Sequence, residues 1–164
     1  MNIKSPLVKV RILIGIFITA LLVAGFTAFP LESEIKLLCK ILNISIDNPA
    51  ANEGFLSYWL ALVAQGLITT NEAYPFLAYG FDWMAFAHVI IGVLFIGPFI
   101  DPVKNIWIIY WGIFACIALI PTALICGVIR EIPFFWQLID CSFGVFGIIP
   151  LLLCLKYIKQ LQLK

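Results

Sequence analysis

Long apolar runs without charged side chains alternate with shorter polar segments along the chain. A helix needs about 20 apolar residues to cross the hydrocarbon core of a bilayer. Asp140 is the only charged residue between Ile132 and Leu155, so it interrupts the last of these runs. The pattern predicts an all-α membrane protein, a four transmembrane helix bundle with spans at about residues 12–29, 83–100, 105–129 and 133–156.

A fifth stretch, Gly54–Asn71, is also uncharged but carries Ser57, Gln65 and two threonines. Lys and Arg collect on the cytoplasmic side of a membrane protein, which allows a choice between four and five spans. Four spans with the N-terminus inside place seven of the 10 Lys and Arg residues on the inner side, whereas a fifth span leaves only four there. We therefore predict that Gly54–Asn71 is a helix that lies in or on the outer membrane face, or dips into it.

This topology puts both termini in the cytoplasm. The inner basic residues are then Lys4, Lys9, Arg11, Lys104, Lys156, Lys159 and Lys164, and the outer ones are Lys36, Lys40 and Arg130. Clusters of aromatic residues at the ends of the spans agree with it, since Trp and Tyr favour membrane interfaces. The first span is longer than the apolar part of a signal peptide, so we predict an uncleaved anchor.

The segment between the first two spans, about residues 31–81, is predicted to be helical and to lie on the outer face as an amphipathic segment. Its first helix carries one apolar face at helical spacing, made of Leu31, Ile35, Leu38, Ile41 and Leu42. A turn follows at Asp47-Asn48-Pro49. Together with the spans, this segment is expected to form a single membrane domain of residues 1–164.

Several residues at the span ends are suited to starting or bending helices. Asp82, and Asp101 followed by Pro102, are typical of helix N-caps, and Pro133 can open the fourth span. Kinks are predicted at the prolines inside the spans, Pro98, Pro121 and Pro150.

The composition supports the membrane assignment and excludes several functions. Of the 164 residues, 63% are hydrophobic and 12% charged, whereas about 25% of the residues of a soluble domain are charged. No basic block is present to bind phosphates, so nucleic acid is not an expected partner. A single histidine with scattered acids matches no metal-ligand spacing, and the sequence specifies no cofactor. The five cysteines include no Cys-x-x-Cys motif, and a bridge between Cys126 and Cys141 stays open.

Ionisable side chains gather near the outer ends of the predicted spans. At a rise of 1.5 Å per residue, His88 lies roughly 7–8 Å inside the outer aromatic belt and Asp140 about 6 Å inside it. Arg130 ends the third span on the same side. Each of them shares a helix face with small residues, which let membrane helices approach closely. We therefore expect these side chains to point into the bundle.

Two interpretations of this cluster are open. In the structural one, Arg130 and Asp140 form a buried ion pair, and His88 donates a hydrogen bond to a backbone carbonyl. In the functional one, an ionisable residue inside the membrane marks a site. His88 would then be a general acid or base, and Asp140 would orient it or share its proton. The candidate catalytic residues are His88 and Asp140, and the candidate ligand-binding residues are Arg130, Asp82, Tyr79, Gln137 and Trp136.

Three stretches resemble a known family. They are YGFDWMAFAH (Tyr79–His88), FIGPFIDPVKNIW (residues 95–107) and IPFFWQLIDCSFG (Ile132–Gly144). They resemble a family of small bacterial four-span integral membrane proteins of unassigned function, over about Pro75–Tyr157. The resemblance implies a bacterial cytoplasmic (inner) membrane location. It brings no activity, cofactor or catalytic residue with it.

Three functions are compatible with the sequence. The first is a polar site at the outer end of the bundle that binds a small or amphiphilic ligand, with membrane-embedded catalysis as an extension. The second is an accessory or assembly subunit of a membrane complex, with a protein partner in the membrane and polar residues that only fix helix packing. The third is a transporter or proton path. It ranks last because the inner halves of the spans lack polar residues. In every case membrane lipid is an expected partner.

Overall fold

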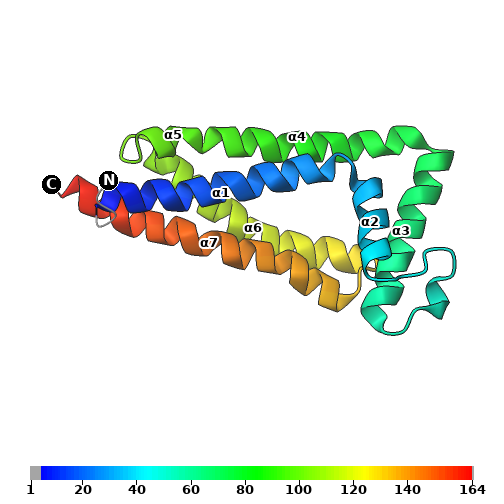
Figure 1. Cartoon of the computed structure of the whole chain (residues 1–164). Coiled ribbons are helices and arrows are strands. Elements are labelled where there is room, and N and C mark those ends of the chain that lie inside the picture. Colours follow the sequence, from blue (N-terminus) through cyan, green and yellow to red (C-terminus); the bar gives the residue numbers. More distant parts are fainter. Residues whose placement is uncertain (1–4, 164) are drawn as a thin grey trace. The chain divides into compact units, whose positions relative to one another are not determined.

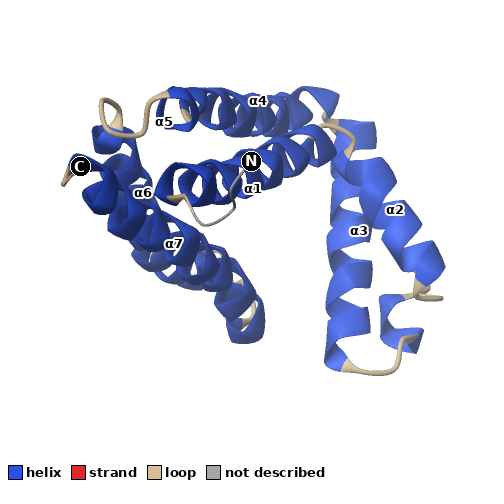
Figure 2. Ribbon diagram, turned by 60° about the vertical axis from the view of Figure 1, so that its left-hand side comes forward, coloured by secondary structure: helices blue, strands red, loops and turns tan. Residues whose placement is uncertain are grey.

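The structure is a computed structural model that describes residues 5–163, and every regular element in this range is a helix (Figures 1 and 2). In chain order these are α1 (Pro6–Ala28), α2 (Leu31–Ile41), η1 (Pro49–Ala51), α3 (Phe55–Ala73), η2 (Pro75–Ala78), α4 (Tyr79–Leu94), α5 (Ile96–Ile100), α6 (Ile106–Ile129) and α7 (Phe134–Gln162). Four helical stretches within it are long and apolar enough to cross a membrane, namely Pro6–Ala28, Pro75–Ile100, Ile106–Ile129 and Phe134–Gln162. The predicted fold class, an all-α membrane protein with four spans, is confirmed.

The chain divides into two compact units. The first unit comprises, among the described residues, 5–20 and 91–163, and the second unit is Leu21–Ile90. Helices α1 and α4 each contribute to both units, because the unit boundaries fall inside these helices.

In the first unit, α6 and α7 pack closely because glycines line their contact face. A Cβ added at Gly144 would lie only 2.6 Å from the Cys116 carbonyl oxygen, and one at Gly147 would lie 2.9 Å from Cys116 Sγ. Cys141 Sγ lies 3.8 Å from the Ile120 carbonyl oxygen. The predicted approach of the third and fourth spans through small residues is therefore what the structure shows.

The second predicted span is interrupted at Phe95. Helix α4 ends at Leu94, and α5 resumes at Ile96. Pro98 lacks the N–H that would continue the helical hydrogen bonds across this point. The ring of Phe95 is fully buried, with its centroid 4.7 Å from that of Phe17. The kink predicted at Pro98 is thus a break in the helix, whereas α6 and α7 continue past their own prolines.

The start of α1 and the end of α7 lie at the same end of the first unit (Figure 1). Lys9 Nζ lies 4.9 Å from the centroid of the Tyr157 ring. The guanidinium of Arg11 donates to the carbonyl oxygens of Phe99 and Ile100 at 3.1 and 3.3 Å, which brings the end of α5 to this place as well. A chain that crosses the membrane an even number of times must begin and end on the same side, which agrees with this position of α1 and α7. Lys4 and Lys164, which entered the charge count, lie outside the described residues.

The helix starts differ in part from those expected. Asp101 accepts a hydrogen bond from the Lys104 amide at 3.0 Å and closes a turn, while α6 begins only at Ile106. The predicted cap at Asp101 is therefore wrong. Asp82 lies inside the first turn of α4, after the helix has begun at Tyr79, so it is not the N-cap either. Pro133 does precede the first residue of α7, as expected.

In the second unit, α2 and α3 run antiparallel as a helical hairpin, which lies across the direction of α4 (Figure 1). The connection between them is organised by Asn52. Its side chain accepts from the Ser45 amide at 2.7 Å and donates to the carbonyl oxygens of Ser45 and Pro49 at 2.8 and 3.0 Å. The softer apolar stretch Gly54–Asn71 thus folds into a helix, and it is not among the four candidate spans.

The contact face of α2 differs from the apolar face expected. Leu31, Ile35 and Cys39 follow one another at a spacing of four, and Cys39 is fully buried. Leu38 and Ile41 are 40% and 67% exposed. The hairpin therefore buries one edge of the apolar face and leaves the other edge uncovered.

Candidate functional site

The second unit contains a cavity of about 310 Å³. Three segments line it: the junction of α1 with α2, the last turns of α3, and the start of α4 with the preceding η2. Its lining residues are Phe29, Pro30, Leu31, Glu32, Ser33, Leu67, Thr70, Asn71, Leu77, Ala78, Phe81 and Asp82. All of them belong to the second unit, so the cavity is complete within it.

Two prolines explain why three helices meet around this space. Pro30 follows the end of α1 and precedes the first residue of α2. Pro75 comes after Tyr74, which ends α3, and it opens η2. Because proline favours a helix start and disfavours helical backbone at the residue before it, the chain ends one helix and begins another at both places.

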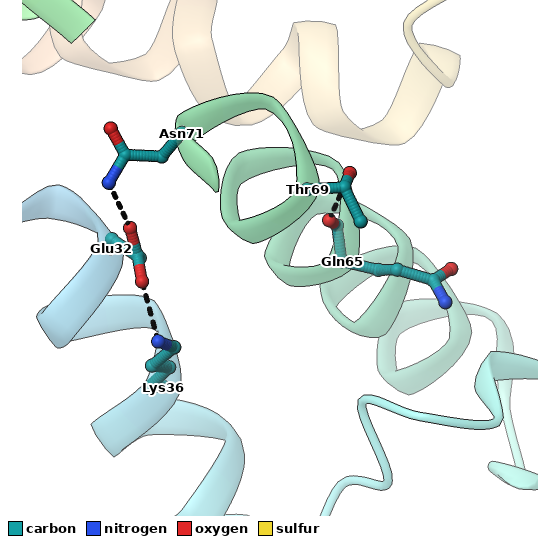
Figure 3. Close-up of polar contacts among 5 residues, drawn as sticks. All are labelled: Glu32, Lys36, Gln65, Thr69 and Asn71. Carbon is teal, nitrogen blue, oxygen red and sulfur yellow. Dashed lines mark hydrogen bonds and ion pairs between the residues drawn. The ribbon is translucent and has the colours of Figure 1, made fainter. Parts of the chain in front are cut away.

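Glu32 joins two helices on the polar side of the cavity (Figure 3). Its Oε1 accepts from Lys36 Nζ at 2.5 Å, and its Oε2 accepts from Asn71 Nδ2 at 2.6 Å. Lys36 lies one turn further along α2, whereas Asn71 belongs to α3 (Figure 3). Two hydrogen bonds lower the pKa of Glu32 below its ordinary value. The one from Lys36 has the larger effect, and the one from Asn71 the smaller. The negative charge of Glu32 is therefore already satisfied by the protein.

Other polar groups near Asn71 are occupied within α3. The hydroxyl of Thr69 donates to the Gln65 carbonyl oxygen at 2.8 Å, one turn back along the helix (Figure 3). Such a bond satisfies a hydroxyl in an apolar setting at little cost. Thr69 is therefore held by its own helix, whereas its neighbours Thr70 and Asn71 line the cavity.

Asp82 is the second carboxylate on the wall of the cavity. It lies in the first turn of α4, where the partial positive charge of the helix start favours an acid. Across residues 5–163, no hydrogen bond or ion pair to its side chain is found. Asp82 is therefore the one acidic group on the cavity wall, within the described chain, whose oxygens have no protein partner.

The rest of the wall is largely apolar. Leu31, Leu67, Leu77 and the rings of Phe29 and Phe81 contribute to it. Ligand sites in proteins measure about 300–1,000 Å³ and combine apolar walls with a few placed polar groups. The cavity falls at the lower end of this range, so it can hold a small molecule or one part of a longer one.

Two of the residues expected from sequence lie at or near the cavity. Asp82 lines it directly. Tyr79, the first residue of α4, is exposed, and its ring meets that of Trp83 edge-on with centroids 5.8 Å apart. Tyr79 is not among the residues that line the cavity. Asp82 is thus a candidate ligand-binding residue that lines the cavity, and its ligand role stays a prediction.

His88 lies further along α4, against α1. Its Nδ1 is 2.8 Å from the Met84 carbonyl oxygen. A carbonyl only accepts hydrogen bonds, so Nδ1 is the donor in this contact. A Cβ added at Gly25 of α1 would lie 3.2 Å from His88 Cβ, so the two helices approach closely here. This is the carbonyl bond of the structural interpretation, and it leaves Nε2 for the functional one.

The remaining expected residues belong to the first unit. Gln137 is buried, donates from Nε2 to the Ile132 carbonyl oxygen at 2.7 Å, and fills the notch that Gly127 leaves. The rings of Trp136 and Phe135 meet edge-on at 6.1 Å. These contacts stabilise the α6–α7 connection, and a ligand role for Gln137 and Trp136 stays a prediction.

Arg130 and Asp140 do not form the ion pair of the structural interpretation. Arg130 ends α6 with an exposed side chain. In the described part of the chain, Lys36 with Glu32 is the only salt bridge. That part of the structural interpretation is wrong, because no salt bridge joins Arg130 to Asp140 within the described residues. His88 and Asp140 fall in different units, so their meeting stays a prediction.

No known protein family, curated protein or solved structure matches the chain. The resemblance of Pro75–Tyr157 to small bacterial membrane proteins therefore stays a prediction. The cavity has to be interpreted from its own geometry and charge.

Metal and disulfide chemistry can be assessed for the described residues. Between residues 5 and 163, no group of three or more His, Cys, Asp and Glu side chains is close enough to hold a metal ion. All five cysteines are free, so Cys126 and Cys141 do not form the bridge that the sequence left open. Cys126 is exposed, whereas Cys141 is buried against α6.

Sequence reasoning missed the polar wall formed by Glu32 and Asn71. The spacing of Glu32 and Lys36 is that of a helical ion pair, which is visible in the sequence. Asn71, however, lies 39 residues from Glu32 and ends an unremarkable threonine-rich turn. Only the antiparallel hairpin brings it to the carboxylate.

Proposed function

We propose that this protein binds a small amphiphilic molecule in the cavity of the second unit. The observation that carries the proposal is a cavity of about 310 Å³ with apolar walls and one carboxylate, that of Asp82, without a protein partner. An apolar chain gains about 25 cal/mol per Å² of surface that it buries. The unpartnered carboxylate supplies a polar anchor for the head of the same molecule.

We further propose that the cavity lies on the extracytoplasmic side of a bacterial cytoplasmic membrane, with both chain termini in the cytoplasm. Lys9, Arg11 and the α5–α6 turn, which carries Lys104, lie at one end of the first unit. Basic residues favour the cytoplasmic side, which supports this orientation. The lining residues of the cavity include Phe29, which follows the last residue of α1, and Asp82, which lies near the start of α4. Lys9 and Arg11, by contrast, lie near the start of α1, and Lys104 follows α5.

The exposed apolar edge of α2 supports a position at the membrane interface. Leu37, Leu38 and Ile41 are exposed, and they share the helix with Lys36 and Lys40. An amphipathic helix with apolar and basic residues lies well at the boundary between headgroups and acyl chains. A hairpin in this position would bring the cavity within reach of molecules dissolved in the bilayer.

An accessory role in a membrane complex is favoured by a different observation. The buried side chain of Gln137 packs against Gly127, and its amide donates a hydrogen bond to the Ile132 carbonyl oxygen. A polar residue in a span can therefore serve packing alone. This interpretation predicts that no small molecule occupies the cavity. The following experiment therefore separates the two functions.

The test is photolabelling of the full chain in phosphatidylcholine nanodiscs with a decanol analogue that carries an alkyl diazirine. We expect the label on peptides that contain Leu67 or Phe81, which line the cavity. Leu67→Trp fills the cavity and should remove the label, whereas Leu56→Trp changes an exposed leucine elsewhere in α3 and should not. Equal labelling of both variants, or labels spread evenly over the spans, would disprove the proposed function.

A further inference from the structure

We infer that the cavity selects amphiphiles whose head is a cation, namely an ammonium group that pairs with Asp82. This inference rests on the proposed function and adds the chemical class of the ligand to it. It follows from the charges on the cavity wall and from which of them the protein already compensates.

The ionisable side chains that line the cavity are both acids, Glu32 and Asp82. Neither Lys, Arg nor His is among its lining residues. Glu32 receives Lys36 and Asn71 at 2.5 and 2.6 Å, so its charge is balanced inside the protein. The net charge that the wall presents to a ligand is therefore the single negative charge of Asp82.

The surroundings of Asp82 strengthen this preference. Asp82 lines a space whose other walls include Leu77 and Phe81, and a charge beside apolar walls is screened less than one in bulk water. A carboxylic head would be repelled, and a hydroxyl head would offer only a neutral hydrogen bond. An ammonium head gives a charge-assisted bond, which is about twice as strong as a neutral one. The rings of Phe29 and Phe81 on the same wall also favour a cation over an anion.

The position of Asp82 at the start of α4 also affects its carboxylate. The helix start stabilises an acid there without any ligand. That effect accounts for the presence of the acid but satisfies neither of its oxygens with a specific donor. The carboxylate therefore remains available to a ligand, and the wall itself supplies no competing cation.

The test compares three heads on one chain length. Decylamine, decanol and decanoate compete with the photoactivatable decanol analogue for the full-length protein in phosphatidylcholine nanodiscs at pH 7. We expect decylamine to compete about tenfold more strongly than decanol, which corresponds to about 1.4 kcal/mol, and decanoate to compete least. The comparison needs no variant, so it remains decisive even where a substitution prevents folding.

Substitutions then assign the preference to one side chain. In Asp82→Asn the advantage of decylamine over decanol should fall to about twofold or less, and Asp82→Glu should restore part of it. Asp101→Asn removes an acid of the α5–α6 turn, outside the cavity, and should leave the advantage unchanged. A preference that survives Asp82→Asn would overturn the inference, because it would come from the bilayer or from another group.

The outcomes distinguish the two levels of the proposal. If all three heads compete equally, the cationic preference fails and the amphiphile site stands. If none of them competes and the label is absent, the proposed function fails as well. Butylamine separates a lipid amine from a small free amine: weak competition supports an amphiphile, whereas competition equal to that of decylamine supports the ammonium site and contradicts the need for a chain.

Discussion

The amide of Asn71 donates to the carboxylate of Glu32 with an Nδ2–Oε2 distance of 2.6 Å, and this bond closes the α2–α3 hairpin beside the cavity. It connects residues 39 positions apart and joins the first turn of α2 to the end of α3. Because Lys36 binds the other oxygen, both sides of the carboxylate are occupied. The hairpin should therefore respond to the ionisation of Glu32.

The stability of the hairpin should fall in acid. The pKa of Glu32 is lowered in the folded state by Lys36 and Asn71, so its ionised form favours folding. That contribution is fully present above the unfolded pKa, whose reference value is 4.5, and it is lost as the pH falls through the lower folded pKa. Glu32 is partly exposed, so we expect a small effect. Thermal unfolding of wild type and Glu32→Gln at several pH values measures it.

In this experiment the wild type should have the higher Tm at pH 7, and the difference should shrink below about pH 4.5. Glu34→Gln, which removes another acid of α2, controls for net charge. A difference that stays constant down to pH 3 would contradict the role assigned to the Glu32 carboxylate.

The contact of α6 and α7 should depend on Gly144. A Cβ at this position would lie 2.6 Å from the Cys116 carbonyl oxygen, so Gly144→Ala forces the two helices apart. Overpacking of this kind costs typically about 1–3 kcal/mol. Unfolding in SDS, followed by tryptophan fluorescence, should show the loss. Gly66→Ala is the matched control, because a Cβ there has nothing within 4 Å and alanine favours a helix.

The predicted meeting of His88 and Asp140 can be tested by crosslinking. In a background with the native cysteines replaced by alanine, the pair His88→Cys and Asp140→Cys should form a disulfide under mild oxidation. Such a bond needs Cα atoms within about 7 Å. The pair His88→Cys and Asp101→Cys is the control and should stay reduced. Absence of the first crosslink in folded protein would end the prediction of a shared site for His88 and Asp140.

The orientation in the membrane predicts which residues an impermeant reagent reaches. In the same cysteine-free background, Ser45→Cys lies in the exposed α2–α3 connection and should react with a membrane-impermeant maleimide on intact cells. Lys104→Cys lies in the α5–α6 turn and should react only after lysis. The reverse result would invert the proposed topology and place the cavity in the cytoplasm.

The helices were predictable from sequence because the bilayer allows few alternatives. Backbone groups in hydrocarbon must bond within their own segment, so long apolar runs become helices. The softer stretch Gly54–Asn71 was correctly separated from the spans by the distribution of charge. Small residues also indicated the α6–α7 contact, since Gly144 and Gly147 lack the side chains that would hold the helices apart.

The site was predictable only in part, because its contacts join distant residues. Asp82 was among the candidate ligand-binding residues, whereas Glu32 and Asn71, which line the same cavity, were not, since only the hairpin brings them together. The expected pairing of Arg130 with Asp140 assumed that opposite charges at similar depth meet. In the structure, Arg130 at the end of α6 is exposed and forms no salt bridge with Asp140. Depth along a helix follows from counting residues, whereas direction around it depends on packing.

The boundaries between the two units pass through the interiors of α1 and α4 and not through loops. No cut in the chain can therefore release either unit without severing a membrane-spanning helix. Fragments that begin or end near Ala20 or Ile91 should fail to insert as stable pieces. Chimeras that exchange parts with another protein would have to carry both of these helices whole.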